Sequence, residues 1–231
     1  KGKNIDGNKF ADEALKKKAS ICILEKNYSK KNPRKIFVKD TLNTFSNLSC
    51  IIRKSLGTPI VAITGSAGKT SLKELIGQSL NTLIPTSYSK KSFNNQYGVP
   101  LSLFNIDKKH KIGVFEIGMD KKGEIDKLSN LIQPDIGVIT NISYAHIKNF
   151  NSIKEIAEAK AEIIKNITIG GRIILNSDDV FYSFFRERAL NRGLKIISFS
   201  FKNKSDFQFI DNKKNRINKI IEIKTNNKTY K

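Results

Sequence analysis

The sequence predicts an α/β protein whose mostly parallel sheet is covered by helices on both faces. From Pro59 onward, short segments that are apolar throughout alternate with segments of helical periodicity. Strands that are apolar on both sides are typical of a buried parallel sheet. One of these segments runs directly into a glycine loop that ends in Gly68-Lys69-Thr70. The 231 residues suffice for one good core, or for one core and a small second domain.

The first 57 residues predict a small α/β unit. Its expected elements are a helix at 10–15, strands at 20–25 and 36–38, and a helix that has Thr41 as its N-cap and ends near Gly57. The segment Leu56–Pro59 marks the expected boundary. We therefore expect an N-terminal domain over residues 1–57 and a central domain over residues 58–231.

The sequence of the central domain predicts alternating strands and helices. Strands are expected at 60–64, 112–116, 135–140, 172–176 and 195–200, and helices at 69–80, 98–104, 124–132, 152–165 and 179–191. Ser152 with Glu155 three residues later forms a capping box for one helix. The tail from Asp206 alternates only weakly, which predicts a peripheral antiparallel hairpin.

The composition bears on partners and compartment. The net charge of +21 is spread along the chain, and nearly all of it comes from Lys, with Arg at seven positions. Because no aromatic residues interleave with a basic cluster, we expect no nucleic-acid binding. No apolar run approaches the roughly 20 residues that span a bilayer, so we expect no stable membrane insertion. The two cysteines, Cys22 and Cys50, are expected to be buried thiols of a cytoplasmic protein.

The glycine loop is the strongest functional signal. It follows the apolar strand 60–64 and precedes a helix, and its residues are Gly65, Ser66, Ala67, Gly68, Lys69, Thr70 and Ser71. Such a loop aims unpaired backbone N–H groups at one point, at the positive end of the helix. A lysine and a hydroxyl at that point suit a nucleotide triphosphate and its magnesium ion. The sequence therefore predicts a phosphate site of a shortened Walker type.

Two other polar residues follow predicted strands. Glu116 ends the strand 112–116, where a carboxylate next to a phosphate loop can hold magnesium. His146 comes shortly after the strand 135–140, in Thr140-Asn-Ile-x-x-Ala-His146. Ligands of parallel sheets bind at the carboxyl ends of strands. We therefore expect Lys69, Thr70, Glu116 and His146 to converge at one rim of the sheet.

Three further groups are ambiguous when each is taken alone. Lys160 sits in a helical segment, where an exposed lysine is the ordinary alternative. Asn94 and Asn95 precede Gly98-Val-Pro100 and fit a turn that starts a helix. Asn176 and Asp179 follow a strand and could simply cap the next helix.

In combination, these motifs resemble the Mur ligases, ATP-dependent amide-forming enzymes of peptidoglycan precursor synthesis. The motifs are Ile63-Thr-Gly-Ser-Ala-Gly-Lys-Thr-Ser71, Asn94-Asn95-x-x-Gly98-x-Pro100, Glu116-x-Gly118, Gly123-Glu124-Ile125, Thr140-Asn-Ile-x-x-Ala-His146, Ala159-Lys160-x-Glu162 and Leu175-Asn176-x-Asp178-Asp179. The asparagine pair and Gly123-Glu124-Ile125 are most similar to the branch of the family that adds D-alanyl-D-alanine to UDP-N-acetylmuramoyl-tripeptide.

The resemblance implies a role for each motif. Lys69 and the loop amides would hold the β- and γ-phosphates of ATP. Thr70 and Glu116 would hold one Mg²⁺, and His146 a second. Lys160 resembles a lysine that several members carbamylate. The same resemblance places Asn94 and Asn95 near the γ-phosphate and the substrate peptide, and Asn176 and Asp179 near the adenosine.

The implied reaction passes through an acyl phosphate and needs no nucleophilic side chain. The implied partners are UDP-N-acetylmuramoyl-tripeptide and D-alanyl-D-alanine, and the implied setting is a cytoplasmic monomer that serves cell-wall synthesis and cell division. The family's third domain and its uridine-binding segment find no counterpart here. We therefore expect a partial chain that binds nucleotide weakly and does not complete ligation.

Alternatives remain open at this point. Within the family fold, the chain could belong to an enzyme that adds the third amino acid or to a folylpolyglutamate synthase. From another class, a phosphate-loop nucleotidase could use the basic surface to bind nucleic acid, which predicts hydrolysis stimulated by DNA or RNA. A nucleotide-binding module without catalysis is the third alternative.

Overall fold

The structure is a computed structural model that describes residues 5–26, 32–144, 149–212, 220–225 and 228–230. Its contacts separate the chain into two compact units, residues 1–49 and 50–231. Helix α2 (Thr41–Leu56) runs across this division. The sequence placed the boundary several residues later, near Leu56–Pro59. That the two parts are a substrate domain and a nucleotide domain stays a prediction.

The first unit is a short parallel pair of strands with one helical segment. Its elements are η1 (Gly7–Phe10), α1 (Ala11–Lys16), β1 (Cys22–Leu24) and β2 (Lys35–Phe37). The side chain of Asn8 accepts the backbone N–H of Glu25 at 2.8 Å, which ties the helical segment to the end of β1.

The start of α2 corrects one expectation from the sequence. The carboxylate of Asp40 accepts the backbone N–H of Asn43 at 2.8 Å, so Asp40 and not Thr41 caps the helix. The hydroxyl of Thr41 instead donates to Glu25 at 2.7 Å. Both residues are good capping types, and the fold selects the one whose side chain lies outside the first turn.

The second unit is built on one sheet of nine strands among the described residues. The strands are β3 (Ile60–Thr64), β4 (Thr86–Tyr88), β5 (Ile112–Glu116), β6 (Ile136–Ile139), β7 (Arg172–Asn176), β8 (Lys195–Ser200), β9 (Phe207–Asn212), β10 (Ile220–Thr225) and β11 (Thr229–Tyr230). Their order across the sheet is β11-β10-β9-β8-β7-β6-β3-β5-β4. The pairs from β4 to β9 are all parallel, which confirms the predicted fold class.

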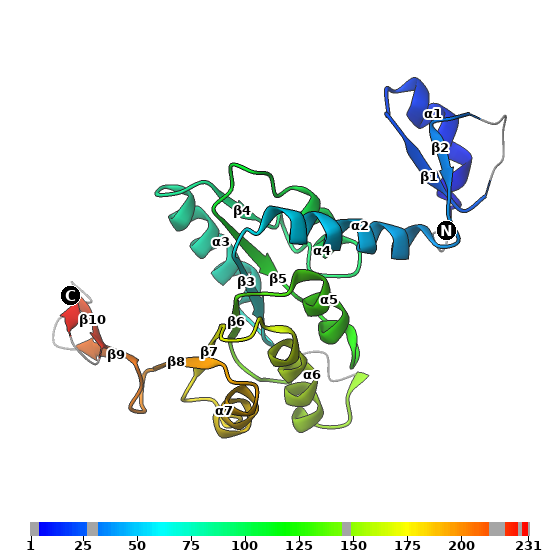
Figure 1. The fold of residues 1–231 in the computed structure, drawn as a ribbon. Coiled ribbons are helices and arrows are strands. Elements are labelled where there is room, and N and C mark those ends of the chain that lie inside the picture. Colours follow the sequence, from blue (N-terminus) through cyan, green and yellow to red (C-terminus); the bar gives the residue numbers. More distant parts are fainter. Residues whose placement is uncertain (1–4, 27–31, 145–148, 213–219, 226–227, 231) are drawn as a thin grey trace. The chain divides into compact units, whose positions relative to one another are not determined.

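Helices cover both faces of the central strands (Figure 1). They are α3 (Lys69–Asn81), α4 (Gly98–Phe104), α5 (Glu124–Ile132), α6 (Ile153–Asn166) and α7 (Tyr182–Asn191). On one face, α3 packs Leu72 and Ile76 against Val61 and Ile63. On the other face, residues of α4, α5, α6 and α7 form a larger core over Ile60 and Ala62. Successive side chains of β3 point to opposite faces of the sheet and therefore pack into two separate cores.

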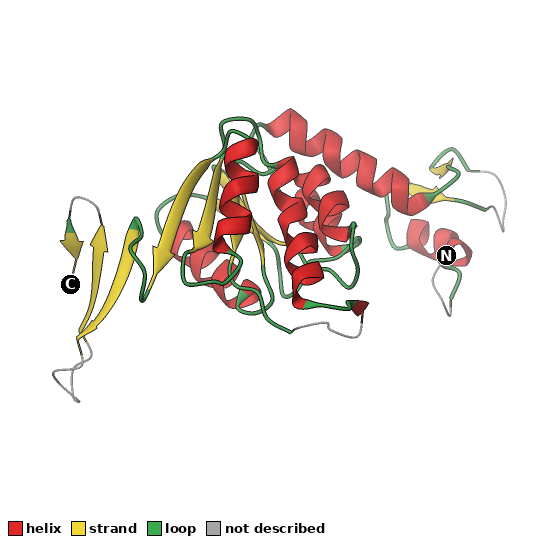
Figure 2. Cartoon of the chain, turned by 90° about the horizontal axis from the view of Figure 1, so that it is seen from below, coloured by secondary structure: helices red, strands yellow, loops and turns green. Residues whose placement is uncertain are grey.

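The tail forms the predicted antiparallel hairpin, β9 with β10. It also extends the main sheet, because β9 pairs with β8 in parallel. Figure 2 shows β9, β10 and β11 reaching beyond the helices that cover the central strands. Strand β4 was not predicted, since its three residues, Thr86–Tyr88, carry no apolar pattern.

Two helix starts refine the sequence predictions. Ser152 accepts the backbone N–H of Glu155 at 3.2 Å, as the capping box requires. In a full capping box the carboxylate of Glu155 would accept the N–H of Ser152, but here it accepts the N–H of Asn151 at 2.9 Å. Helix α7 begins at Tyr182 rather than at Asp179, because the Asp179 carboxylate accepts the N–H of Phe181 and forms a turn there.

The cysteines correct a second expectation. Cys22 and Cys50 are free thiols, and both are partly exposed rather than buried. Cys22 begins the short strand β1, whereas Cys50 lies within α2. Among the described residues, no helix combines the length and the apolar character that crossing a membrane requires.

Candidate nucleotide site at the rim of the sheet

The glycine loop joins β3 to α3 at the carboxyl edge of the sheet. Gly68 adopts the left-handed conformation, with φ of 79°, and is the N-cap of α3. Gly65 has φ of 145°, and a Cβ atom there would lie 1.9 Å from Oγ1 of Thr140. Glycine is therefore required at Gly65 both by the backbone angle and by the close approach of the segment after β6. The first turn of α3 begins without a side-chain cap, as an anion site requires.

The segment after β6 braces the glycine loop. The N–H of Ser66 donates to the carbonyl oxygen of Asn141 at 2.9 Å. The N–H of Ala67 donates to the side-chain oxygen of Asn141 at 3.0 Å. These two amides are therefore occupied and are not among the unpaired N–H groups that the loop was expected to offer. The N–H groups at the start of α3 are the ones available to a phosphate.

Lys69 folds back over the loop. Its ammonium donates to the carbonyl oxygens of Gly65 at 2.9 Å and of Ser66 at 3.4 Å. Burial lowers the pKa of Lys69, and the negative charge of Glu116 acts in the opposite direction. The ammonium thus lies beside the helix N-terminus, where it adds positive charge to the anion site.

Lys160 reaches the same loop from α6. Its side chain is 2% exposed, and its Nζ donates to the carbonyl oxygen of Gly65 at 2.9 Å. Burial, and then the positive charge of Lys69, lowers the pKa of Lys160 to about 7. The exposed alternative that the sequence left open is therefore excluded. A substantial fraction of Lys160 is neutral amine near pH 7.

Glu116 lies at the end of β5, next to β3, and is 1% exposed. One carboxylate oxygen accepts the hydroxyl of Thr70 at 2.7 Å. The other accepts the side-chain amide of Asn94, also at 2.7 Å. Both hydrogen-bond donors are neutral groups. Thr70, Glu116 and Asn94 therefore meet at one point, as the sequence predicted for the first two.

These groups match the ligand chemistry of Mg²⁺, which prefers hydroxyl and carboxylate oxygens. The hydroxyl of Thr70 and the carboxylate of Glu116 already touch, so one ion can be held by both. No group of three or more His, Cys, Asp or Glu side chains suited to a metal occurs within the described ranges. A full set of ligands would need phosphate oxygens and water. His146, the expected second ligand, lies outside the described residues.

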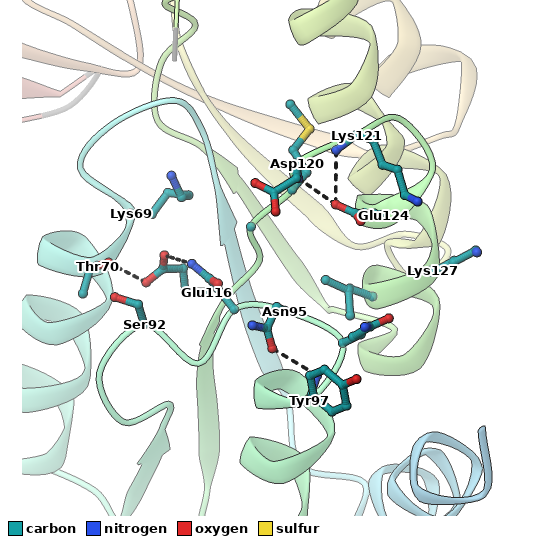
Figure 3. Close-up of a pocket in the computed structure, with 15 residues that line it drawn as sticks. Lys69, Thr70, Ser92, Asn95, Tyr97, Glu116, Asp120, Lys121, Glu124 and Lys127 are labelled. Carbon is teal, nitrogen blue, oxygen red and sulfur yellow. Dashed lines mark hydrogen bonds between the residues drawn. The ribbon is translucent and has the colours of Figure 1, made fainter. Parts of the chain in front are cut away.

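A cavity of about 560 Å³ opens beside Glu116. Figure 3 shows its walls: the start of α3 with Lys69 and Thr70, the segment before α4 with Ser92 and Asn95, and the start of α5. The α5 wall carries charged side chains of both signs, including Lys121, Glu124 and Lys127. The phosphate end is therefore continuous with space for a larger polar molecule.

Asn94 and Asn95 make different contacts. Asn94 contacts Glu116, as described above. Asn95 lines the cavity, and its side-chain oxygen accepts the N–H groups of Tyr97 at 3.1 Å and Gly98 at 3.0 Å. Asn95 thus also starts α4, which is the conventional role that the sequence left open.

Asn176 and Asp179 do not line this cavity. Asn176 accepts the N–H of Asp178 at 3.0 Å, and Asp179 accepts the N–H of Ile142 at 2.8 Å. Asp179 therefore connects the end of β7 to the same segment, after β6, that braces the glycine loop. That both residues lie near the adenosine stays a prediction.

Several residues of the site received no role from the sequence. Asn141 braces the loop, and Lys73 is completely buried on α3. Glu162 of α6 accepts the N–H groups of Gly123 and Asp126 and so positions the start of α5. The spacing of Lys73 was a usable signal, because it lies three residues after Thr70 and four after Lys69. Residues so spaced share a helix face.

The fold and this rim define the class of protein: an α/β domain with a glycine loop of the phosphate-binding type at the carboxyl edge of its parallel strands. The family model described as the Mur ligase middle domain matches residues 63–231. The chain belongs to the Mur ligase family.

Two kinds of relative support this assignment. The UDP-N-acetylmuramoyl-tripeptide–D-alanyl-D-alanine ligase of Buchnera aphidicola subsp. Baizongia pistaciae is 35% identical over 205 residues, which are 88% of this chain and 44% of that protein. The crystal structure of MurF from Acinetobacter baumannii has a TM-score of 0.90 and 29% identity, and covers 100% of this chain and 50% of that one.

A third relative bears on the nucleotide. The MurF ligase of Thermotoga maritima, solved in complex with ADP, has a TM-score of 0.85 and 27% identity. The match covers 100% of this chain and 52% of the Thermotoga maritima chain. The present chain thus spans about half the length of the relatives it matches.

Proposed function

We propose that this chain forms the nucleotide-binding part of an ATP-dependent ligase that joins D-alanyl-D-alanine to UDP-N-acetylmuramoyl-tripeptide in peptidoglycan precursor synthesis. The observation that carries the proposal is the contact of Thr70 and Asn94 with the two oxygens of Glu116, beside Lys69. Relatives that carry the name of this activity support the choice of substrates.

The proposed chemistry has two steps. A carboxylate of the tripeptide attacks the γ-phosphorus of ATP, an O–P bond forms, and ADP leaves. The neutral amine of D-alanyl-D-alanine then attacks the acyl carbon, phosphate leaves, the amine's proton passes to solvent and an amide remains. The first step brings two anions together, so positive charge at the loop is essential.

The residues would divide this work as follows. The N-terminus of α3 and the ammonium of Lys69 would bind the β- and γ-phosphates. Thr70 and Glu116 would hold a Mg²⁺ ion, which supplies charge neutralisation at the transferring phosphoryl group when bound. Asn94 would keep the Glu116 carboxylate oriented, and Asn95 would face the peptide from the cavity wall.

Lys160 would act as a carbamate. The neutral amine attacks carbon dioxide, an N–C bond forms and a proton is lost. The side chain, which is a cation when protonated, thus becomes a carboxylate-like anion. The low pKa of Lys160 supports this role, because only the neutral amine reacts. The carbamate and His146 would hold a second Mg²⁺, while Asn176 and Asp179 would lie near the adenosine. We place the reaction in the cytoplasm, in a monomer that serves cell-wall growth and cell division.

A binding experiment tests the nucleotide site directly. The purified chain is titrated with a fluorescent ATP analogue and Mg²⁺. Lys69→Ala is expected to weaken binding by about 10- to 100-fold, the cost of losing a charge-assisted hydrogen bond. The matched control is Lys165→Ala, since Lys165 is exposed on α6. Equal affinities of the wild type and Lys69→Ala would overturn the proposed phosphate site.

The acceptor needs a second experiment. The segments of the Thermotoga maritima relative that this chain does not cover are joined to it in their natural order. ADP release is then measured with UDP-N-acetylmuramoyl-tripeptide and each candidate amine. D-alanyl-D-alanine is expected to support turnover, whereas diaminopimelate, lysine and glutamate are not. The chain by itself is expected to form no amide. Turnover with another amine, or by the chain alone, contradicts the corresponding part of the proposal.

A further inference from the structure

Among the described residues of the second unit, Lys73 is the largest charged side chain that is completely buried. It is 0% exposed, although it lies on the same helix as the phosphate-binding Lys69. Its ammonium donates to the carbonyl oxygens of Ser89 at 2.6 Å and of Lys91 at 2.9 Å, and it also contacts the carboxylate of Glu74. A buried charge is stable only when such partners surround it.

The two carbonyls belong to the segment between β4 and α4. This segment continues through Ser92 and Asn94 to Tyr97, and these residues form one wall of the cavity. Lys91 itself has φ of 49°, a left-handed angle that is unfavourable for a residue with a side chain. Strained backbone of this kind persists where its surroundings fix it, and it clusters at ligand sites. Here the ammonium of Lys73 donates to the carbonyl oxygen of this strained residue.

The same segment also contacts the metal-binding carboxylate. The hydroxyl oxygen of Ser89 accepts the N–H of Glu116 at 3.5 Å, a long contact, and Asn94 donates to the Glu116 side chain. Helix α3 therefore acts on Glu116 by two routes. Thr70 touches the carboxylate directly, and Lys73, one turn later on the same helix face, fixes the segment that carries Asn94.

We propose that Lys73 is a positioning residue: it sets the segment 89–97 against α3 so that Asn94 and Thr70 hold Glu116 from two sides in the orientation that binds Mg²⁺. This inference rests on the proposed function, because it assumes a metal at Glu116. Lys73 itself touches neither the phosphate nor the metal.

The test compares Lys73→Met with the matched control Lys165→Met, an exposed lysine of α6. Binding of a fluorescent ATP analogue is titrated with Mg²⁺ and repeated in EDTA. Lys73→Met is expected to raise the Mg²⁺ concentration for half-maximal binding by about tenfold. This is the lower end of the loss caused by removing a direct partner of a metal ligand, because Lys73 acts on Glu116 only through Asn94. Binding in EDTA should be unchanged. An equal loss with and without Mg²⁺ would show a merely structural role and overturn the inference.

A double-mutant cycle sharpens the result. If Lys73 acts through Asn94, the Mg²⁺ requirement of Lys73→Met with Asn94→Ala should be no greater than that of the stronger single variant. Additive losses would contradict the inference. Lys73→Gln, which keeps an N–H donor without the charge, is measured in parallel in case Lys73→Met does not fold.

Hydrogen exchange supplies a readout that needs no nucleotide. In Lys73→Met the amides of residues 89–97 should exchange faster, whereas those in the middle of β3 should not. Unchanged exchange in 89–97 would overturn the inference even if binding changed. Failure of the proposed function is a distinct outcome, because it would appear as a wild-type chain that binds no nucleotide or ignores Mg²⁺.

Discussion

Lys69 and Lys160 donate to the same acceptor, the carbonyl oxygen of Gly65, each at 2.9 Å. They reach it from different helices, α3 and α6. Neither ammonium forms an ion pair with a carboxylate in the part of the chain that the structure describes. Two cations on one carbonyl repel each other, and this repulsion adds to burial in lowering the pKa of Lys160. The site therefore favours a neutral or modified Lys160 and an anion beside Lys69.

The first prediction concerns stability and pH. An unfolded lysine keeps its proton up to a pKa of 10.5, whereas folded Lys160 loses it above about 7. Between these values the unfolded state binds more protons, so the free energy of unfolding rises with pH, by at most about 1.4 kcal/mol per pH unit. Below pH 7 both states are protonated and this slope vanishes. Urea unfolding at pH 7.5 and 8.5, in buffer free of carbon dioxide, measures the effect.

Lys160→Met is the control for that measurement, because it removes the titrating group and keeps an apolar chain of similar length. The variant should show a smaller rise between the two pH values than the wild type. Identical pH slopes in both proteins would contradict the lowered pKa.

The second prediction concerns the carbamate. The chain in ¹³C-bicarbonate at pH 8 should give a carbamate carbon signal by NMR, since the neutral amine of Lys160 is abundant there. The signal should vanish in Lys160→Ala and remain in Lys165→Ala. In a longer polypeptide that contains this sequence and catalyses the ligation, a short carboxylic acid should partly restore the activity of the Lys160→Ala variant. Absence of both the signal and the rescue would remove this role.

The third prediction concerns the charge of Glu116. Glu116→Gln keeps the size of the side chain, and its amide can donate to the hydroxyl of Thr70, so we expect the chain to fold. The Mg²⁺ concentration for half-maximal ATP binding should rise by at least about tenfold, because a neutral amide is a poor ligand for a hard cation. Mg²⁺ titrations of nucleotide binding, with and without the substitution, provide the measurement. An unaltered Mg²⁺ requirement means that the ion binds elsewhere.

The fourth prediction concerns Gly118, which lies two residues after Glu116. A Cβ atom at Gly118 would be 2.9 Å from Cγ of Asn94. Gly118→Ala should therefore displace Asn94 from Glu116 and lower the free energy of unfolding by about 1–3 kcal/mol through overpacking. Urea unfolding and Mg²⁺ titration together measure it. Gly7→Ala is the control, since a Cβ there meets nothing within 4 Å. A harmless Gly118→Ala would show that Asn94 is free to move.

The sequence by itself determined the elements and the phosphate loop. Apolar segments alternating with helical periods were enough to predict β3, β5, β6, β7 and β8, and the glycines were enough to place the loop between β3 and α3. Glu116 could be chosen as well, because the end of an apolar strand is a local feature of the sequence. These features depend on neighbours in the chain.

The tertiary structure alone decided which polar groups meet. A lysine in a helix has the same local pattern whether it is exposed, like Lys165, or buried, like Lys160. Lys160 reaches Gly65 across 95 positions of sequence, and Asn94 reaches Glu116 across 22. Such contacts, and the pKa of Lys160 that follows from them, arise from the packing of α6 and of the segment before α4 against the sheet, which no local pattern encodes.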